Sequence, residues 1–220
     1  MGSEMCIRDS PKAMPSAGAS MLLGSIYLIQ GKVARAEELT LDAYRNTQHL
    51  PDRSYIPLAT SLNYSSVLLL AKKPEVATAL LRDKIAAVEE SWPAEHLYSG
   101  RFFALLAKAE LDAGNTKVAL AHKRKIQRAD FSSRPDYEAR AIVTLAELAL
   151  YDDKLTPAEL TETYDATIKA EQLIKENARI PTWALPEIQW LQTALQQKLG
   201  LAGASAVDRA RRAYLGALPD

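Results

Sequence analysis

Apolar residues recur at steps of three and four along most of the chain, and strand-like alternation is nearly absent. Runs of alternating Val, Ile or Thr closed by Asn-Gly or Asp-Gly turns do not occur in the sequence. Steps of three and four are the period of a helix that buries one face, whereas strands alternate at every second residue. The pattern therefore predicts an all-α protein.

Short breaks interrupt this pattern near residues 31, 72, 114 and 153, at an interval of about 40 residues. Each break separates two helical stretches, and proline-bearing segments at 50–57, 91–93 and 131–135 separate one pair of stretches from the next. A helical hairpin cannot bury its apolar face alone, so successive hairpins stack. We predict an α-solenoid of about four antiparallel hairpins plus C-terminal helices, with helices near 22–30, 33–49, 58–71, 75–90, 93–113, 116–128, 135–151, 156–176, 182–199 and 205–214.

Several residues carry specific start and stop signals for these helices. Gly31 stands where a glycine ends a helix, and Pro74 stands where a proline fits the first turn of the next one. The sequence Thr156-Pro-Ala-Glu159 predicts a capping box at the start of a helix. These signals agree with the boundaries drawn from the apolar period.

The first hairpin resembles the tetratricopeptide repeat, a motif of two helices that pack closely through small residues. Its signature positions in this chain are Leu23, Gly24, Tyr27, Gly31, Ala36 and Ala43. The third hairpin matches through Leu106, Ala107, Gly114 and Ala119, and the other two match in outline. The resemblance covers about residues 20–176. The period near 40 is longer than the family's usual 34 residues and looks like that of long-period variants in bacterial regulatory proteins.

The resemblance implies that the first helix of each hairpin lines a concave groove that holds peptides. Side chains expected on that surface are Asn63, Ser66, Arg101, Lys108, Asp112, Arg140, Glu147 and Tyr151. Their mixed charges indicate no preference for the sign of a ligand.

No constellation of residues predicts catalysis, a cofactor or a metal site. The three histidines lie on separate predicted helices, and His122 falls on an apolar stripe, which favours a core or boundary position over a metal ligand. The sequence YDDKL (151–155) begins like an aspartate-rich magnesium motif but lacks the later acid, so a solvated turn is the favoured interpretation. We therefore expect no enzyme activity.

The helix predicted at 182–199 is apolar on two sides. One side carries Ile188, Leu191, Leu195 and Leu199, and the other carries Trp183 and Trp190. A helix of this kind must be covered twice. The favoured interpretation is that the neighbouring helices cover both sides, and the alternative is that the two tryptophans anchor a partner.

Acidic and basic residues balance at 27 each, which argues against binding of nucleic acid by the whole chain. The stretch 117–128 is basic, and a solvated outer helix is a better interpretation of it than a nucleic-acid site. No apolar run is long enough to span a membrane. These features favour a cytoplasmic protein with a protein or peptide partner, whose oligomeric state stays open.

The opening decapeptide MGSEMCIRDS fits no apolar period and contains Cys6, the single cysteine. Its last six residues resemble translated sequencing-adaptor sequence, so we expect residues 1–10 to be non-native and the chain to be a piece of a longer bacterial protein. We divide the remainder into a linker at 11–19, a repeat domain at 20–200, and a capping helix or the start of a further unit at 201–220.

Two functions fit these features. The first is a non-enzymatic interaction or scaffold module, and the second is the helical regulatory arm of a signalling protein or transcription regulator whose effector domain lies elsewhere. An all-helical enzyme is a third and weaker alternative, because it requires converging acids or a metal cluster.

Overall fold

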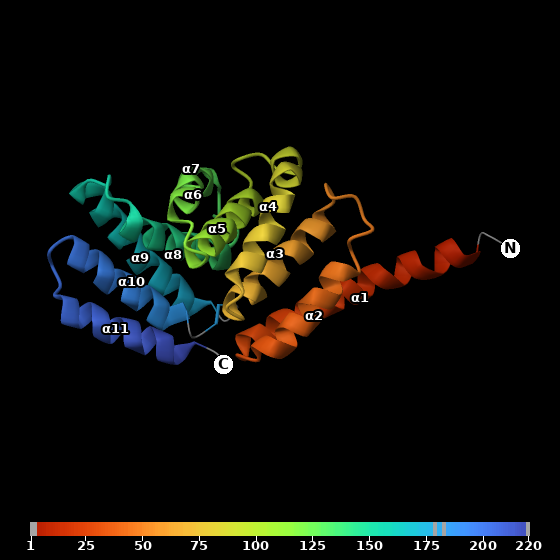
Figure 1. The fold of residues 1–220 in the computed structure, drawn as a ribbon, viewed down its shortest axis with the longest axis horizontal. Coiled ribbons are helices and arrows are strands. Elements are labelled where there is room, and N and C mark those ends of the chain that lie inside the picture. Colours follow the sequence, from red (N-terminus) through yellow and green to blue (C-terminus); the bar gives the residue numbers. More distant parts are fainter. Residues whose placement is uncertain (1–3, 178–179, 182–183, 219–220) are drawn as a thin grey trace. The chain divides into compact units, whose positions relative to one another are not determined.

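A computed structural model of the chain describes residues 4–177, 180–181 and 184–218, with side chains from Ala17 onward. The described residues are helical apart from turns and connections, which confirms the prediction of an all-α fold (Figure 1). The chain divides into two compact units, with the boundary between Ser91 and Trp92.

The first unit contains two helical hairpins. Their helices are α1 (Glu4–Ile29), α2 (Val33–Arg45), α3 (Tyr55–Leu70) and α4 (Pro74–Ser91). Residues 11–19, for which the sequence suggests a linker, form part of α1, and the side chain of Ala17 is fully buried. Residues 1–3 and the side chain of Cys6 lie outside the described part, so the proposed origin of the decapeptide stays a prediction.

The second unit continues the plan. Its helices are α5 (Leu97–Asp112), α6 (Thr116–Ala121), α7 (Lys123–Arg128), α8 (Pro135–Tyr151), α9 (Pro157–Glu176), α10 (Ala184–Lys198) and α11 (Ala204–Ala217). The return helix expected at 116–128 is split at His122, whose backbone N–H donates to the carbonyl oxygen of Ala119, three residues back, at 3.1 Å. The predicted tenth helix is α11, which packs against α10.

The same hydrogen-bonded cap closes four helices along the chain. Residues 31, 72, 114 and 200 each adopt a left-handed backbone, with φ between 58° and 81°. At each one, the N–H of the following residue donates to a carbonyl oxygen five residues back, as from Lys32 to Tyr27 at 2.9 Å. Three of these positions are glycines, which enter this conformation freely, and the fourth is Lys72. The repeated cap gives the hairpins a common turn geometry.

Close packing between helices depends on small residues, as the sequence suggested for Gly24. A Cβ atom on Gly24 would lie 2.7 Å from the Cγ2 atom of Thr40 on α2. In the second unit, a Cβ atom on Gly100 would lie 2.2 Å from the Cβ atom of Ala129. Both distances are shorter than real Cβ contacts, so these helices approach their neighbours only because a side chain is missing.

The core of the second unit joins α8, α9 and α10. Ile188, Leu191 and Leu195, three of the four residues of the predicted apolar stripe, are fully buried there. The side chain of Leu199 packs against the same cluster. The described helices include none long and apolar enough to cross a bilayer.

Candidate protein-binding face

First helices of consecutive hairpins lie side by side in the second unit. Helix α8 contacts α5 on one side and α10 on the other (Figure 1). Six of the eight predicted groove residues lie on α5 and α8, whereas Asn63 and Ser66 lie on α3 of the first unit. Ser66 uses its hydroxyl group within α3, where it donates to the carbonyl oxygen of Leu62 at 2.8 Å. We therefore describe the site on the second unit alone.

Lys108 is the centre of this site. Its ammonium group lies 2.8 Å from Oδ1 of Asp112, one turn along α5, and 2.9 Å from Oε1 of Glu147 on α8. The structure thus brings three predicted residues together. The other oxygen of Glu147, Oε2, is buried and has no hydrogen-bond partner among the described residues.

Burial and neighbouring charges have opposite effects on the pKa values of this ion pair. Burial alone would lower the pKa of Lys108, but the charges of Glu147 and Asp112 outweigh it, so the pKa of the ammonium group is raised. For Glu147 burial outweighs the attraction of Lys108, and the pKa of that carboxyl group is raised as well. Lys108 is therefore held in its protonated form.

Two residues not anticipated from the sequence complete the cluster. Glu187, in the first turn of α10, is 8% exposed, and the phenol of Tyr214 on α11 donates to its Oε1 atom at 3.3 Å. Burial raises the pKa of Glu187 to about 7, although the positive charge of Lys108 opposes the shift. Burial and the negative charge of Glu187 raise the pKa of Tyr214.

Arg101 lies at the other end of the site, against an aromatic ring of α8. Its Nη1 group donates to the phenol oxygen of Tyr137 at 3.0 Å, and its guanidinium carbon lies 4.5 Å from the centre of that ring. The guanidinium group of Arg134 lies 3.8 Å from the same ring centre and forms two hydrogen bonds with Asp136, at 2.9 and 2.6 Å. The charge of Arg134 is therefore neutralised locally.

Arg140 follows Tyr137 by about one turn of α8, and its side chain is exposed. It forms no hydrogen bond or ion pair with the described residues. Desolvation by the surrounding protein and repulsion from Arg101 both lower its pKa, while Glu187 and Asp136 oppose this. We call the surface formed by Arg101, Lys108, Asp112, Arg140, Glu147 and Glu187 the first-helix face.

The remaining predicted residues fall outside this network. Tyr151, at the end of α8, is 51% exposed. Trp190 is half-buried and stacks on Tyr214, with ring centres 5.5 Å apart and planes 5° from parallel. This contact covers part of the tryptophan side of α10 from within the chain. The role of Trp190 as a partner anchor stays a prediction, and Trp183 lies outside the described residues.

The sequence contains a signal for some of the site residues that the sequence analysis did not name. Tyr137 precedes Arg140 by three residues, and Tyr98 precedes Arg101 by three, so each tyrosine lies on the same face of its helix as an arginine already expected in the groove. Glu187 lies between Trp183 and Trp190 at helical spacing, which marks an acid on a mostly apolar side. The position of Tyr214 depends on how α11 packs, and no periodicity in the sequence reveals that.

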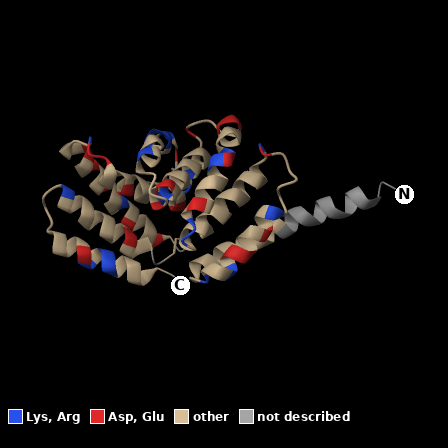
Figure 2. Cartoon of the chain, viewed as in Figure 1, with Lys and Arg blue, Asp and Glu red and all other residues tan. Residues whose placement is uncertain are grey.

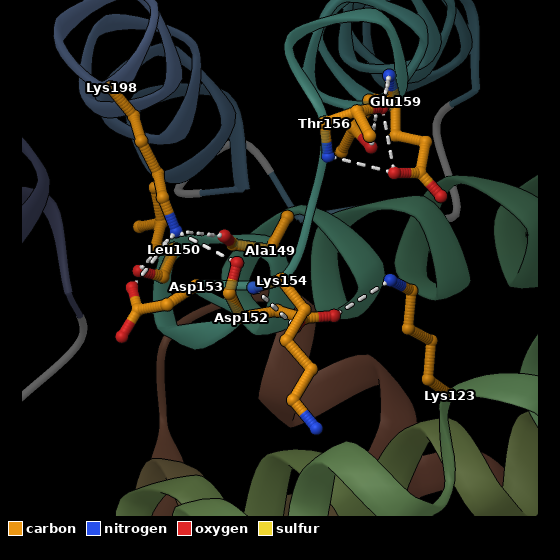
Figure 3. Close-up of polar contacts among 10 residues, drawn as sticks. Lys123, Ala149, Leu150, Asp152, Asp153, Lys154, Thr156, Glu159 and Lys198 are labelled. Atoms are coloured by element: carbon orange, nitrogen blue, oxygen red, sulfur yellow. Dashed lines mark hydrogen bonds and ion pairs between the residues drawn. The ribbon is translucent and has the colours of Figure 1, made fainter.

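The YDDKL segment forms a structural turn between α8 and α9 (Figure 3). Asp152 pairs with Lys123 at 3.0 Å and accepts a backbone hydrogen bond from Lys154. Lys198 reaches across from α10 and donates to the carbonyl oxygens of Ala149, Leu150 and Asp152 at 2.9–3.2 Å. The predicted capping box of Thr156 and Glu159 begins α9 directly afterwards. These contacts give Asp152 a structural role in the turn.

The basic stretch 117–128 is partly occupied by contacts within the chain. Lys123 pairs with Asp152, and the ammonium group of Lys125 lies 4.3 Å from the ring centre of Phe103. His122 stacks on the same ring and is half-buried, which agrees with the core or boundary position expected for it. Acidic and basic side chains are interspersed over the helices of the unit (Figure 2).

Comparisons with known proteins bear on the fold. No family model and no curated protein matches the chain. Among the solved structures that resemble it are two of the nearly identical TPR-like repeats of a Podospora anserina protein assigned as a kinesin light chain, one of them a single-residue variant. They superpose with TM-scores of 0.57 and 0.58 at 15% identity, over 90% of this chain and 93% and 92% of theirs. The chain has a tetratricopeptide-like solenoid fold.

In a tetratricopeptide-like fold, successive first helices form one layer and the return helices form another. The contacts of α8 with α5 and α10, and of α9 with both α8 and α10, follow this arrangement. The first-helix face therefore belongs to one structural layer. Among the described residues, no cluster of His, Cys, Asp and Glu has the geometry of a metal site.

Proposed function

We propose that the chain is a non-enzymatic protein-binding module and that its first-helix face binds a peptide or a segment of a partner protein. The observation that carries the proposal is Arg140, an exposed guanidinium group without a hydrogen-bond or ion-pair partner among the described residues, about one turn of α8 from Tyr137. Arginine and aromatic side chains are enriched at protein interfaces and among the residues that contribute most to binding.

The chemistry of the other groups supports binding over catalysis. Lys108 is held as an ammonium ion by two carboxylates, so it lacks the free electron pair that a nucleophile or base requires. Arg134 and Asp136 neutralise each other. The face thus presents fixed charges and rings, which suit the recognition of an extended chain.

A displayed library of random peptides, selected against the full chain, tests the proposal. The selected peptides are then measured against a variant carrying Arg101→Glu and Arg140→Glu together. We expect affinity to fall at least about tenfold, because charge reversal replaces attraction by repulsion.

The matched control is Arg124→Glu, which reverses an exposed charge on α7, outside the first-helix face. This control is expected to bind as the unaltered chain does. Equal binding by the double variant, with its circular dichroism unchanged, would remove the first-helix face as the binding site.

A further inference from the structure

Helix α11 packs on a single helix of the second unit. Among the described helices it contacts α10 alone, whereas α9 contacts both α8 and α10. None of the residues of α11 is fully buried. Its half-buried residues include four that share one side of the helix, namely Ala206, Ala210, Tyr214 and Ala217. The helix is therefore amphipathic and lies on the surface of its unit.

Helices α9 and α11 lie on opposite sides of α10 (Figure 1). Gln192 and Gln196 of α10 donate to side chains of α9 at 3.0 and 2.8 Å. Glu187 and Trp190 of α10 instead contact Tyr214 of α11. At 3.6 residues per turn, Gln192 and Gln196 lie about 140° and 180° around the helix from Glu187. Because α9 is a return helix, α11 lies on the other side of α10, on the first-helix face.

Tyr214 makes the specific contacts of α11 with this face. Its ring stacks on the indole of Trp190, with planes 5° from parallel, and its phenol donates to Glu187 at 3.3 Å. This is the one side-chain hydrogen bond between α11 and α10 among the described residues, and it is longer than most O–H···O bonds. The contact is thus defined in geometry but small in extent.

The segment that joins α10 to α11 is exposed and rich in glycine. Gly200 has a left-handed backbone with φ of 77°, and no atom lies within 4 Å of the place of a Cβ atom on Gly200 or Gly203. Leu201, between these glycines, is 75% exposed. A surface helix with one hydrogen bond to its neighbour and such a connection belongs to the parts of a domain that open locally at low cost.

We propose that α11 is an intramolecular ligand of the first-helix face, and that a helix of a partner protein binds at Trp190 and Glu187 by taking its place. This inference rests on the proposed function of the first-helix face. The two interpretations of the tryptophan side of α10, cover by a neighbouring helix and contact with a partner, are then alternating states of one surface. While α11 is bound, the partner's apparent affinity is reduced to the fraction of chains in which α11 is released.

The contacts of α11 define the kind of helix that fits. Trp190 offers a flat ring for an aromatic side chain, and Glu187 offers a carboxylate oxygen to a hydroxyl donor, so the partner helix should carry a tyrosine. A phenylalanine would keep the stacking but leave the 8% exposed Glu187 without that donor. The residues three and four positions from the tyrosine should be small, as Ala210 and Ala217 are in α11.

The probe for the test is a fluorescein-labelled peptide with the sequence of residues 203–218, GASAVDRARRAYLGAL. It is titrated against the full unaltered chain and against the full chain carrying Tyr214→Ala, whose own α11 lacks the stacking ring. We expect the Tyr214→Ala chain to bind the probe at least about tenfold more tightly, because its site is free more often. Leu215→Ala, at the adjacent side chain, which is 54% exposed, is the matched control and should bind as the unaltered chain does.

Further changes localise the site. Adding Trp190→Ala to the Tyr214→Ala chain should weaken binding of the probe at least about tenfold, because the ring on which the tyrosine stacks is removed. A probe with phenylalanine in place of its tyrosine should bind severalfold more weakly than the original probe. Amide hydrogen exchange in the Tyr214→Ala chain should be faster in α11 and unchanged in α8 and α9, which shows release of α11 without unfolding of the unit.

The peptides selected from the random library separate this inference from the proposed function. Tighter binding of these peptides by the Tyr214→Ala chain than by the unaltered chain supports the inference. Equal binding by both chains, still weakened by charge reversal at the two arginines, overturns it and leaves peptide binding in place. Faster exchange in α11 without binding of the probe overturns it in favour of a fixed cap. Failure of every selected peptide to bind either chain overturns the proposed function and the partner helix with it.

Discussion

Glu187 places an ionisable carboxyl group on a helix whose adjacent residue, Ile188, is fully buried. Its carboxyl group faces the phenol of Tyr214 and lies within the field of Lys108, Glu147 and Arg140. Burial raises its pKa to about 7, from an ordinary value of 4.5. Between these two pH values the folded chain binds more protons than the unfolded chain, so the free energy of unfolding falls as pH rises.

We expect Glu187→Gln to weaken this pH dependence. In the unaltered chain, Glu187 should lower the free energy of unfolding by up to about 3 kcal/mol between pH 4.5 and 8. The amide of Gln cannot ionise, and its oxygen still accepts the bond from Tyr214. Urea unfolding of both proteins at pH 5 and pH 8 measures the difference. The three tryptophans lie at 92, 183 and 190, so their fluorescence reports on the second unit. Identical pH profiles for the two proteins would contradict the assignment.

Gly100 supplies a second prediction at this scale. Gly100→Ala should destabilise the second unit by about 1–3 kcal/mol, because the new methyl group overlaps Ala129 and Phe131. Gly216→Ala is the control, since no atom lies within 4 Å of the place that a Cβ atom would take on this residue of α11. There alanine should stabilise by up to about 1 kcal/mol through helix propensity. Equal effects of both substitutions on urea unfolding would show that Gly100 is not needed for close packing.

At the scale of elements, two kinds of helix end contrast with each other. Four ends use a left-handed residue and the same backbone bonds, and local sequence is enough to produce them. The end of α8 instead depends on Lys198, which is 46–49 residues away in sequence and donates to three of its last carbonyl groups. This end is therefore satisfied by tertiary structure.

Lys198→Met should destabilise the second unit by about 1–3 kcal/mol, since it leaves these carbonyl oxygens without their donor. Lys175→Met is the control, because Lys175 pairs on the surface with Glu171 one turn away and such pairs contribute about 0.5 kcal/mol or less. Urea unfolding followed by tryptophan fluorescence measures both. A Lys198→Met effect no larger than that of the control would refute the capping role.

At the scale of the whole molecule, contacts in the second unit run from neighbour to neighbour. Among the described helices, α8 joins α5 to α10, α9 packs on α8 and α10, and α11 packs on α10. Stability in such an array is close to a sum of repeat and interface terms. A defect in one repeat should therefore be felt most by the repeats it contacts.

Leu191→Ala tests this expectation. The substitution opens a cavity in the core shared by α8, α9 and α10 and should cost about 2–5 kcal/mol. Amide hydrogen exchange should accelerate in α8–α11 more than in α5–α7. Leu215→Ala, at a side chain that is 54% exposed on α11, should leave exchange in α8–α10 unchanged. Uniform acceleration across α5–α11 would indicate that the unit opens as a whole.

The sequence alone was enough to predict most of the helices, their hairpin pairing and most of their ends, although α1 begins at Glu4 and not near residue 22. These features depend on apolar residues spaced three and four apart, on glycines that adopt a left-handed backbone, and on the capping box at Thr156. Each of these signals acts between residues that are close together in the sequence. The break at His122 escaped prediction because the stretch 116–128 keeps a helical pattern across it.

The candidate site was predicted only in part, because most of its contacts join residues that are far apart in sequence. Arg101, Lys108, Arg140 and Glu147 were expected on one surface because the resemblance to the tetratricopeptide repeat implies that the first helices line it. The ion pair of Lys108 with Glu147, the contact of Tyr214 with Glu187, and the lack of a partner for Arg140 among the described residues depend on distances between helices far apart in sequence. Periodicity assigns a residue to a face of its own helix. Only the packing of helices determines which faces meet, and so which charges are paired and which are left unpaired.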